Sequence, residues 1–174
     1  HHEPETKIEV IFHDYQQSKI VSSLLKAHPY EEVAYEIIPL SNSNHWIGSG
    51  MIGFLPQKML LMDFLHLLRQ NMTIEHLKFT NIEKTQQVEI EKVAICGGSG
   101  AFLINNAIKA NADIFISSEF KHNQFIDNYN DIILVDIGHY ESEIQTKILI
   151  FEKVIEKFSN FAVSKYEKNP VRFL

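Results

Sequence analysis

The residues best suited to chemistry lie near the carboxyl end of the chain. An apolar run at 132–135 is followed by Asp136, and Gly138 then precedes His139 and Glu143. The spacing of four residues between His139 and Glu143 places an imidazole and a carboxylate side by side on one face of a helix. Open α/β sheets bind ligands at the carboxyl ends of their strands, which is where this pair is expected. Because imidazole and carboxylate groups bind zinc, iron and manganese, the pattern indicates a divalent-metal site.

The helix predicted at 139–158 keeps this pair away from its apolar side. At about 100° per residue, His139 and Glu143 lie about 120° from the centre of an apolar stripe. That stripe consists of Ile144, Ile148, Phe151, Ile155 and Phe158. The positive end of the helix dipole disfavours a protonated imidazole in the first turn, so the neutral, metal-binding form of His139 is favoured. A solvent-facing histidine followed by ordinary first-turn acids is the alternative.

A glycine-rich segment is the second candidate site. Gly97, Gly98, Ser99 and Gly100 follow an apolar run at 93–96 and precede a predicted helix. Amide groups without side chains at a helix start form a concavity that binds anions, to which Ser99 could add a hydroxyl. A tight turn that needs positive φ angles explains the glycines equally well. No lysine follows them, so a nucleoside-triphosphate loop is not supported.

Several other residues have both a functional and a structural interpretation. Asp136 either joins the metal site or caps the end of its strand. Glu119 could bind a metal, orient a ligand or begin a helix, and His122 could transfer protons, although a structural or solvated role is simpler for each. Cys96 has no activating base beside it in the sequence, which favours a buried thiol over a nucleophile. The glycines of 48–53 have dinucleotide-binding spacing, but a strand is predicted to follow them rather than the required helix.

Length and composition restrict the class of protein. With 174 residues, 45% of them hydrophobic and 22% charged, the chain fits a soluble globular protein of one domain or two small ones. A net charge of −6 disfavours nucleic acid as a partner. A single cysteine excludes an intrachain disulfide and suggests a reducing compartment. No apolar stretch is long enough to span a membrane, so a cytoplasmic location is expected.

The pattern of elements predicts an α/β fold. Near the amino end, strands at 7–12 and 33–40 flank a helix at 14–27, a unit too small to fold alone. A helix at 60–71 and a strand at 76–79 follow. Three strand-then-helix units come next, and such alternation predicts a mixed or parallel sheet covered by helices. These units are 93–96 with 101–110, 113–117 with 119–127, and 132–137 with 139–158, before a last strand at 160–166.

Four motifs in this order, at 28–35, 48–53, 93–100 and 138–143, give the chain its family resemblance. So arranged, the chain resembles the NGG-one interacting factor three family, whose bacterial members are labelled GTP cyclohydrolase I type 2 homologs. The resemblance covers essentially the whole chain. It implies a fold of two α/β halves that hold a dinuclear site for two divalent metal ions, in a protein that assembles as a homohexameric toroid.

The resemblance also implies a domain organisation. Residues 1–45 would be the second half of a ferredoxin-like, PII-type insert, and residues 46–174 the carboxyl-terminal half of the metal-binding domain. His139 and Glu143 match the family's metal-binding histidine and glutamate. The adjacent histidine pair and the aspartate that complete the family's site come from the amino-terminal half and are absent here. The chain departs from its relatives at Ser118, where a glycine is common, and at Asn123, where a histidine is expected.

Two functions follow from the resemblance. One is a metal-dependent hydrolase acting on a phosphate- or nucleotide-containing small molecule, with charge stabilised by the loop at 97–100. The label suggests GTP ring opening, although the sequence shows no guanine pocket. The alternative is a non-enzymatic metal-binding, delivery or regulatory protein whose insert senses a ligand.

Overall fold

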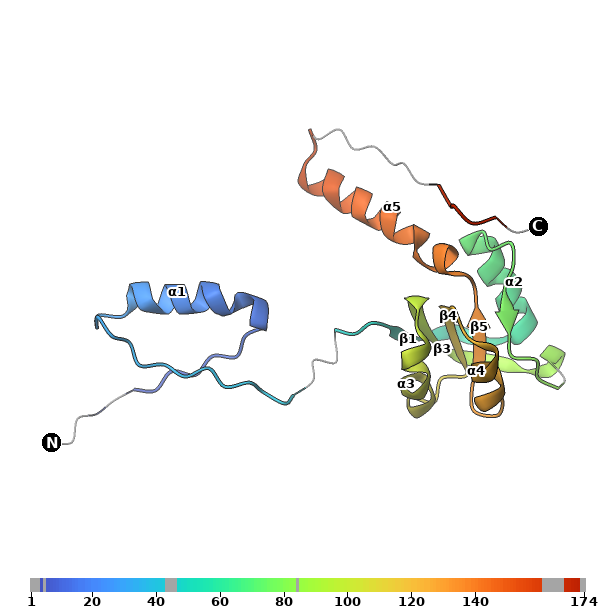
Figure 1. Ribbon diagram of the computed structural model, residues 1–174, viewed down its shortest axis with the longest axis horizontal. Helices are drawn as coiled ribbons and strands as arrows, with labels where there is room; N and C mark the ends of the chain where they lie inside the picture. Colours follow the sequence, from blue (N-terminus) through green and yellow to red (C-terminus); the bar gives the residue numbers. More distant parts are fainter. Residues whose placement is uncertain (1–3, 5, 43–46, 84, 161–167, 173–174) are drawn as a thin grey trace. The chain divides into compact units, whose positions relative to one another are not determined.

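The computed structural model of the protein describes residues 4, 6–42, 47–83, 85–160 and 168–172. The chain divides into two compact units, residues 1–44 and 45–174, and each is described by itself (Figure 1).

The second unit is built on a five-stranded mixed sheet with the order β1-β3-β4-β5-β2. The three inner strands are parallel to one another, and the two edge strands run antiparallel to their neighbours. This confirms the predicted mixed sheet. The strands are β1 (Met51–Leu60), β2 (Lys78–Phe79), β3 (Glu89–Ser99), β4 (Ile114–Ser118) and β5 (Ile133–Asp136).

Helices cover both faces of this sheet. They are α2 (Leu61–Met72), α3 (Ile104–Lys109), α4 (His122–Asp127) and α5 (His139–Lys157), with short 3-10 turns at Thr85–Gln87 and Ala101–Leu103. The segments 60–71, 101–110 and 139–158 are therefore helical largely as predicted. The helix predicted at 119–127 begins three residues late, at His122.

Alternate residues of the central strands form two hydrophobic clusters. Ile114 and Ile116 of β4 pack with residues of α2, whereas Phe115, between them, packs with residues of α3 on the other face. Every residue of β4 and β5 is buried. Strands buried on both faces read as continuous apolar runs, which is why the sequence revealed them. The core thus fixes the strand ends that carry the candidate site.

Helix α5 follows β5 through a glycine turn. Gly138 has a φ of 89°, in a region that L-residues with a side chain rarely adopt. The helix contacts β3 and β4, yet none of its residues is fully buried. Ile148, Ile155 and Phe158 of its apolar stripe are exposed. Most of the strand predicted at 160–166 lies outside the described residues.

In its described residues, the first unit contains helix α1 (Gln17–Ala27) and no strand. This helix, preceded by a 3-10 turn at Asp14–Gln16, confirms the helix predicted at 14–27. The strands predicted at 7–12 and 33–40 are wrong, because neither segment forms a strand in the described residues. Alternation creates one apolar face, but a strand also needs a hydrogen-bonded neighbour. The apolar side chains of these segments consequently stay exposed, as at Ile8 and Ile11.

Candidate metal centre

The parallel strands β4 and β5 bring distant parts of the sequence to one edge of the sheet. Ser117 of β4 lies opposite Asp136 of β5. Both strands run in the same direction, so Glu119, two residues after Ser117, and His139, three residues after Asp136, emerge side by side. The carboxyl end of β3, at 97–99, reaches the same edge beside β4. Ligand sites of open α/β sheets form at such an edge.

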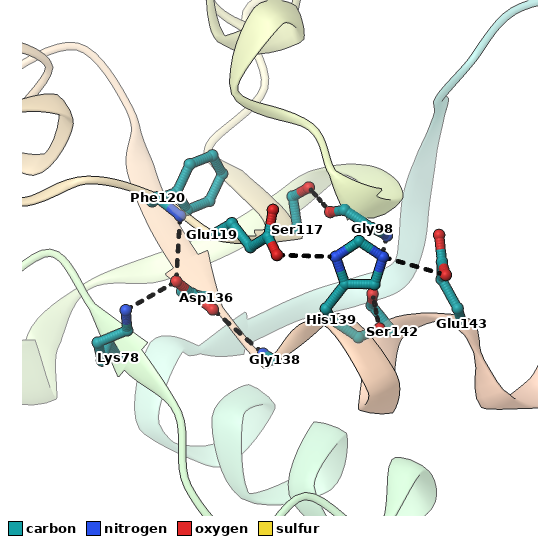
Figure 2. Close-up of polar contacts among 10 residues, drawn as sticks. All are labelled: Lys78, Gly98, Ser117, Glu119, Phe120, Asp136, Gly138, His139, Ser142 and Glu143. Atoms are coloured by element: carbon teal, nitrogen blue, oxygen red, sulfur yellow. Dashed lines mark hydrogen bonds and ion pairs between the residues drawn. The ribbon is translucent and has the colours of Figure 1, made fainter. Parts of the chain in front are cut away.

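His139 lies between two carboxylates (Figure 2). Its Nδ1 is 3.0 Å from Oε1 of Glu119, and its Nε2 is 3.3 Å from Oε2 of Glu143. All three side chains are about half exposed, with 49%, 56% and 52% of their surface accessible for His139, Glu119 and Glu143. The i, i+4 spacing therefore does place His139 and Glu143 side by side.

Both ring nitrogens of His139 face a carboxylate oxygen. A neutral imidazole carries only one N–H and offers a lone pair at its other nitrogen. Only one of the two carboxylates can then accept a hydrogen bond from the neutral ring. The other contact brings a nitrogen lone pair against an anionic oxygen, an arrangement that a cation between the two atoms would stabilise.

Gly98 holds the end of β3 against the first turns of α5. Its amide donates a hydrogen bond of 2.9 Å to Oγ of Ser142, whose hydroxyl donates to the carbonyl of His139 at 2.8 Å. Gly98 has a φ of 64°, and a β-carbon there would collide with Oε1 of Glu143 and lie 3.4 Å from Cε1 of His139. The positive φ therefore occurs inside β3, at the irregularity in its pairing with β4 between Ile95 and Ser99, and not in the predicted turn after the strand. Anion binding by 97–100 stays a prediction.

Asp136 is a structural carboxylate. It is 4% exposed, and both of its oxygens accept hydrogen bonds from backbone amides, Oδ2 from Phe120 and Oδ1 from Gly138, each at 3.1 Å. Lys78 forms an ion pair with Oδ2 at 2.9 Å. Of the two roles considered from the sequence, the structure supports the cap at the strand end.

Glu119 does not begin a helix. It precedes α4 and has a φ of 61°, so its backbone occupies the left-handed region between β4 and that helix. Its side chain contacts His139, a role that the sequence left among several. His122, considered as a proton-transfer residue, lines a cavity of about 440 Å³ with residues of β2 and α4, such as Phe79 and Phe125.

Cys96 is a buried thiol, as predicted. It is 7% exposed and donates to the carbonyl of Ser49 at 3.2 Å. Burial raises the pKa of the Cys96 thiol, the charge of Glu143 raises it further, and a hydrogen bond with Ser117 partly offsets both effects. A thiol that keeps its proton is a weak nucleophile.

The described residues contain no group of three or more histidine, cysteine, aspartate or glutamate side chains that could hold a metal ion. The contacts of His139 explain this result, because its two carboxylate neighbours approach opposite ring nitrogens and do not converge on one point. Among the described residues, His139 therefore forms two separate pairs, one with Glu119 and one with Glu143. The helices in the described part of the chain are also too short or too polar to cross a lipid bilayer.

Comparison with known proteins places these features in a family. Residues 12–170 match the family described as Duf34/NIF3 (NGG1p interacting factor 3). A GTP cyclohydrolase 1 type 2 homolog of Halalkalibacterium halodurans is 33% identical over 80% of this chain and 37% of its own length. A protein of the same name from Listeria monocytogenes is 30% identical over 98% of this chain and 46% of its own length.

Solved structures show the same similarity. The Staphylococcus aureus protein SA1388 is 25% identical, with a TM-score of 0.71, over 96% of this chain and 55% of that one. A Bacillus cereus protein related to NIF3 is 28% identical, with a TM-score of 0.71, over 92% of this chain and 45% of that one. The chain therefore spans about half the length, or less, of the relatives that it matches.

Proposed function

This chain belongs to the Duf34/NIF3 family, and we propose that His139 and Glu143 are two ligands of a divalent-metal site that other residues of a longer protein complete. The observation that carries this proposal is the 3.3 Å separation between Nε2 of His139 and Oε2 of Glu143. Two ligands that share a tetrahedral metal ion at about 2.0–2.1 Å lie about 3.3–3.4 Å apart. The pair thus has a spacing suited to a shared ion.

The surroundings of the pair also support a cation. Oε1 of Glu119 lies 3.0 Å from Nδ1 of His139, and a proton on Nδ1 would leave the Nε2 lone pair directed toward Glu143. The missing side chain of Gly98 makes room for the Glu143 carboxylate beside His139, because a β-carbon there would collide with Oε1. Nitrogen and oxygen donors of this kind accept zinc, iron or manganese. We propose that two such ions bind in the intact protein.

The proposed activity is metal-dependent hydrolysis of a phosphate- or nucleotide-containing small molecule. When bound, a divalent ion activates water and polarises a phosphoryl oxygen. His139 and Glu143 would hold the ion, Glu119 would orient the imidazole, and the backbone of 97–100 would lie beside the substrate. The name GTP cyclohydrolase 1 type 2 homolog, carried by the relatives, supports a nucleotide as the substrate class.

The assembly is part of the same proposal. We propose that residues 1–45 belong to a ferredoxin-like insert and residues 46–174 to one half of the metal-binding domain, in a homohexameric ring. The division of the chain into units 1–44 and 45–174 supports this organisation. The exposed apolar side chains on both sides of α1, such as Ile8 and Ile38, also support it, because a neighbouring part of a larger domain would cover them.

Metal delivery or regulation without catalysis is the second candidate. His139 and Glu143 remain about half exposed, which leaves a bound ion open to exchange with solvent. A groove of about 480 Å³ beside α1, lined by residues that include Val21, Leu25 and Tyr35, favours ligand sensing by the first unit. Under this alternative, the metal-loaded intact protein would hydrolyse no phosphoester or nucleotide in a broad panel.

The test is a titration of the ¹⁵N-labelled chain with Zn²⁺ and Mn²⁺, followed by NMR. We expect shift changes or paramagnetic broadening centred on 97–100, 119 and 139–143, and their loss in His139→Ala and Glu143→Gln. Glu152→Gln is the matched control, because this exposed glutamate lies on the same helix and its substitution makes the same charge change. Equal responses in all four proteins would overturn the site assignment.

A further inference from the structure

We propose that Glu119 is a positioning residue that keeps the proton of neutral His139 on Nδ1, so that Nε2 presents its lone pair toward Glu143. The part of this inference that concerns metal binding rests on the proposed function. The part that concerns the imidazole tautomer stands on the contacts of the metal-free protein.

The contacts of the ring favour this tautomer. The Nδ1–Glu119 separation is 3.0 Å and the Nε2–Glu143 separation is 3.3 Å, so the shorter contact, typical of an N–H donor, is with Glu119. Figure 2 shows the two carboxylates on opposite sides of the ring. Metal-binding histidines generally donate their other ring N–H to a carboxylate or carbonyl, which fixes the tautomer and the ring orientation.

The backbone of Glu119 indicates that its side chain is needed. Three non-glycine residues among the described ones have positive φ, namely Thr73, Asn111 and Glu119. Thr73 caps the end of α2 and Asn111 lies two residues beyond α3, positions where helices commonly end in the left-handed conformation. Glu119 instead lies between a strand and a helix, where glycine would fit with less strain. Such strain is typical of functional positions.

A buried carboxylate sets the distance between the two partners. Oδ2 of Asp136 accepts from the amide of Phe120, next to Glu119, and Oδ1 accepts from the amide of Gly138, next to His139. Phe120 is itself buried in the hydrophobic cluster on the α3 face of the sheet. One buried side chain therefore holds the backbones beside Glu119 and His139 in place, so that the Glu119 carboxylate meets the His139 ring.

The first experiment measures the tautomer of His139 by long-range ¹H–¹⁵N NMR in the metal-free chain at about pH 9, above the ordinary histidine pKa of about 6.5. We expect the Nδ1–H form in the native chain. Glu119→Ala and Glu119→Gly should shift it toward the Nε2–H form, with Glu143 then accepting. Glu119→Gln keeps an acceptor oxygen and should restore part of the Nδ1–H population.

If Glu119→Ala disturbs the fold, Glu119→Gly provides the test, because a glycine adopts the positive φ at this position without strain. An unchanged tautomer in the folded glycine variant would overturn the proposal. A glycine variant that unfolds at higher temperature than the native chain, yet shows the tautomer shift, would support it, since a merely structural role predicts no shift.

The second experiment measures Zn²⁺ affinity by titration. We expect a loss of about 10- to 100-fold in Glu119→Ala, the usual effect of removing a group that orients a metal-binding histidine, and no change in Glu152→Gln. If the native chain bound no Zn²⁺ while the tautomer shift occurred, the metal site would fail and the positioning role would stand. If Zn²⁺ bound equally in all variants and the tautomer did not move, the positioning role would fail alone.

Discussion

Gly98 approaches Glu143 so closely that a β-carbon on the glycine would collide with the carboxylate oxygen Oε1. The obstructing atom is the end of a flexible side chain, so it can move aside. The movement would displace the carboxylate from Nε2 of His139. A glycine near the end of β3 is thus coupled to the geometry of the His139–Glu143 pair on α5.

We predict that Gly98→Ala separates Glu143 from His139 and destabilises the fold. The left-handed φ of 64° costs an L-residue about 1–2 kcal/mol. Urea unfolding should show this loss, and Zn²⁺ titration should show weaker binding. Gly53→Ala is the control, because a β-carbon at Gly53 meets nothing within 4 Å. Native stability and Zn²⁺ binding in Gly98→Ala would contradict the coupling.

Asp136→Asn should loosen the link between the loop before α4 and the turn before α5. The amides of Phe120 and Gly138 donate to different oxygens of Asp136, and asparagine replaces one of these oxygens by an NH2 group that cannot accept. One buried amide is left unsatisfied, and the ion pair with Lys78 is lost. We expect about 1–3 kcal/mol of destabilisation in urea unfolding.

The same substitution should also disturb the contact between His139 and Glu119. The His139 ring resonances of a folded Asp136→Asn variant should show two or more environments in NMR spectra. Asp131→Asn, which changes an exposed carboxylate just before β5, serves as the control. A single native-like ring environment in Asp136→Asn would show that Asp136 does not set this distance.

Alanine substitutions of the two adjacent serines at the end of β4 should change the stability of the fold in opposite directions. Ser117 and Ser118 are both fully buried, and Oγ of Ser117 donates to the carbonyl of Gly98 at 2.9 Å. Oγ of Ser118 has no hydrogen-bond partner among the described residues. We predict that Ser117→Ala destabilises and Ser118→Ala stabilises the fold, each by about 1 kcal/mol. Thermal unfolding of the two variants checks this, and a shift of the same sign in both would refute it.

The sequence predicted the elements of the second unit because each carries a local signal. Strands β4 and β5 are continuous apolar runs, and turn residues such as Gly138 end them. The proximity of His139 and Glu143 follows from helix geometry alone. Burial of Cys96 followed from its place in an apolar run.

What the sequence could not predict depends on tertiary register. The contact between Glu119 and His139 requires β4 and β5 to be parallel neighbours with Ser117 opposite Asp136, and no local pattern encodes that pairing. The sharing of Asp136 between two turns has the same origin. In the first unit, alternation at 7–12 and 33–40 predicted strands that the structure does not contain, because a partner strand is not a local property.

The Cys96 thiol should react slowly with alkylating reagents, and the pH dependence of its reaction rate should be shifted to higher pH. Burial, followed by the nearby charge of Glu143, raises its pKa despite the hydrogen bond with Ser117. The midpoint of the iodoacetamide rate profile should therefore lie above the ordinary thiol pKa of about 8.5. Glu143→Gln should lower that midpoint without returning it to the ordinary value, because burial is the larger cause.

The raised pKa also fixes how stability depends on pH. The unfolded thiol loses its proton at lower pH than the folded one, so above the unfolded pKa the native state binds more protons. This contribution to the free energy of unfolding is complete below the unfolded pKa and falls as pH rises through the folded pKa. Cys96→Ser should remove this contribution. The measurement is the free energy of urea unfolding of both proteins, compared from neutral to alkaline pH. Parallel profiles would show that Cys96 ionises equally in both states, and the buried thiol would then have no part in the alkaline loss of stability.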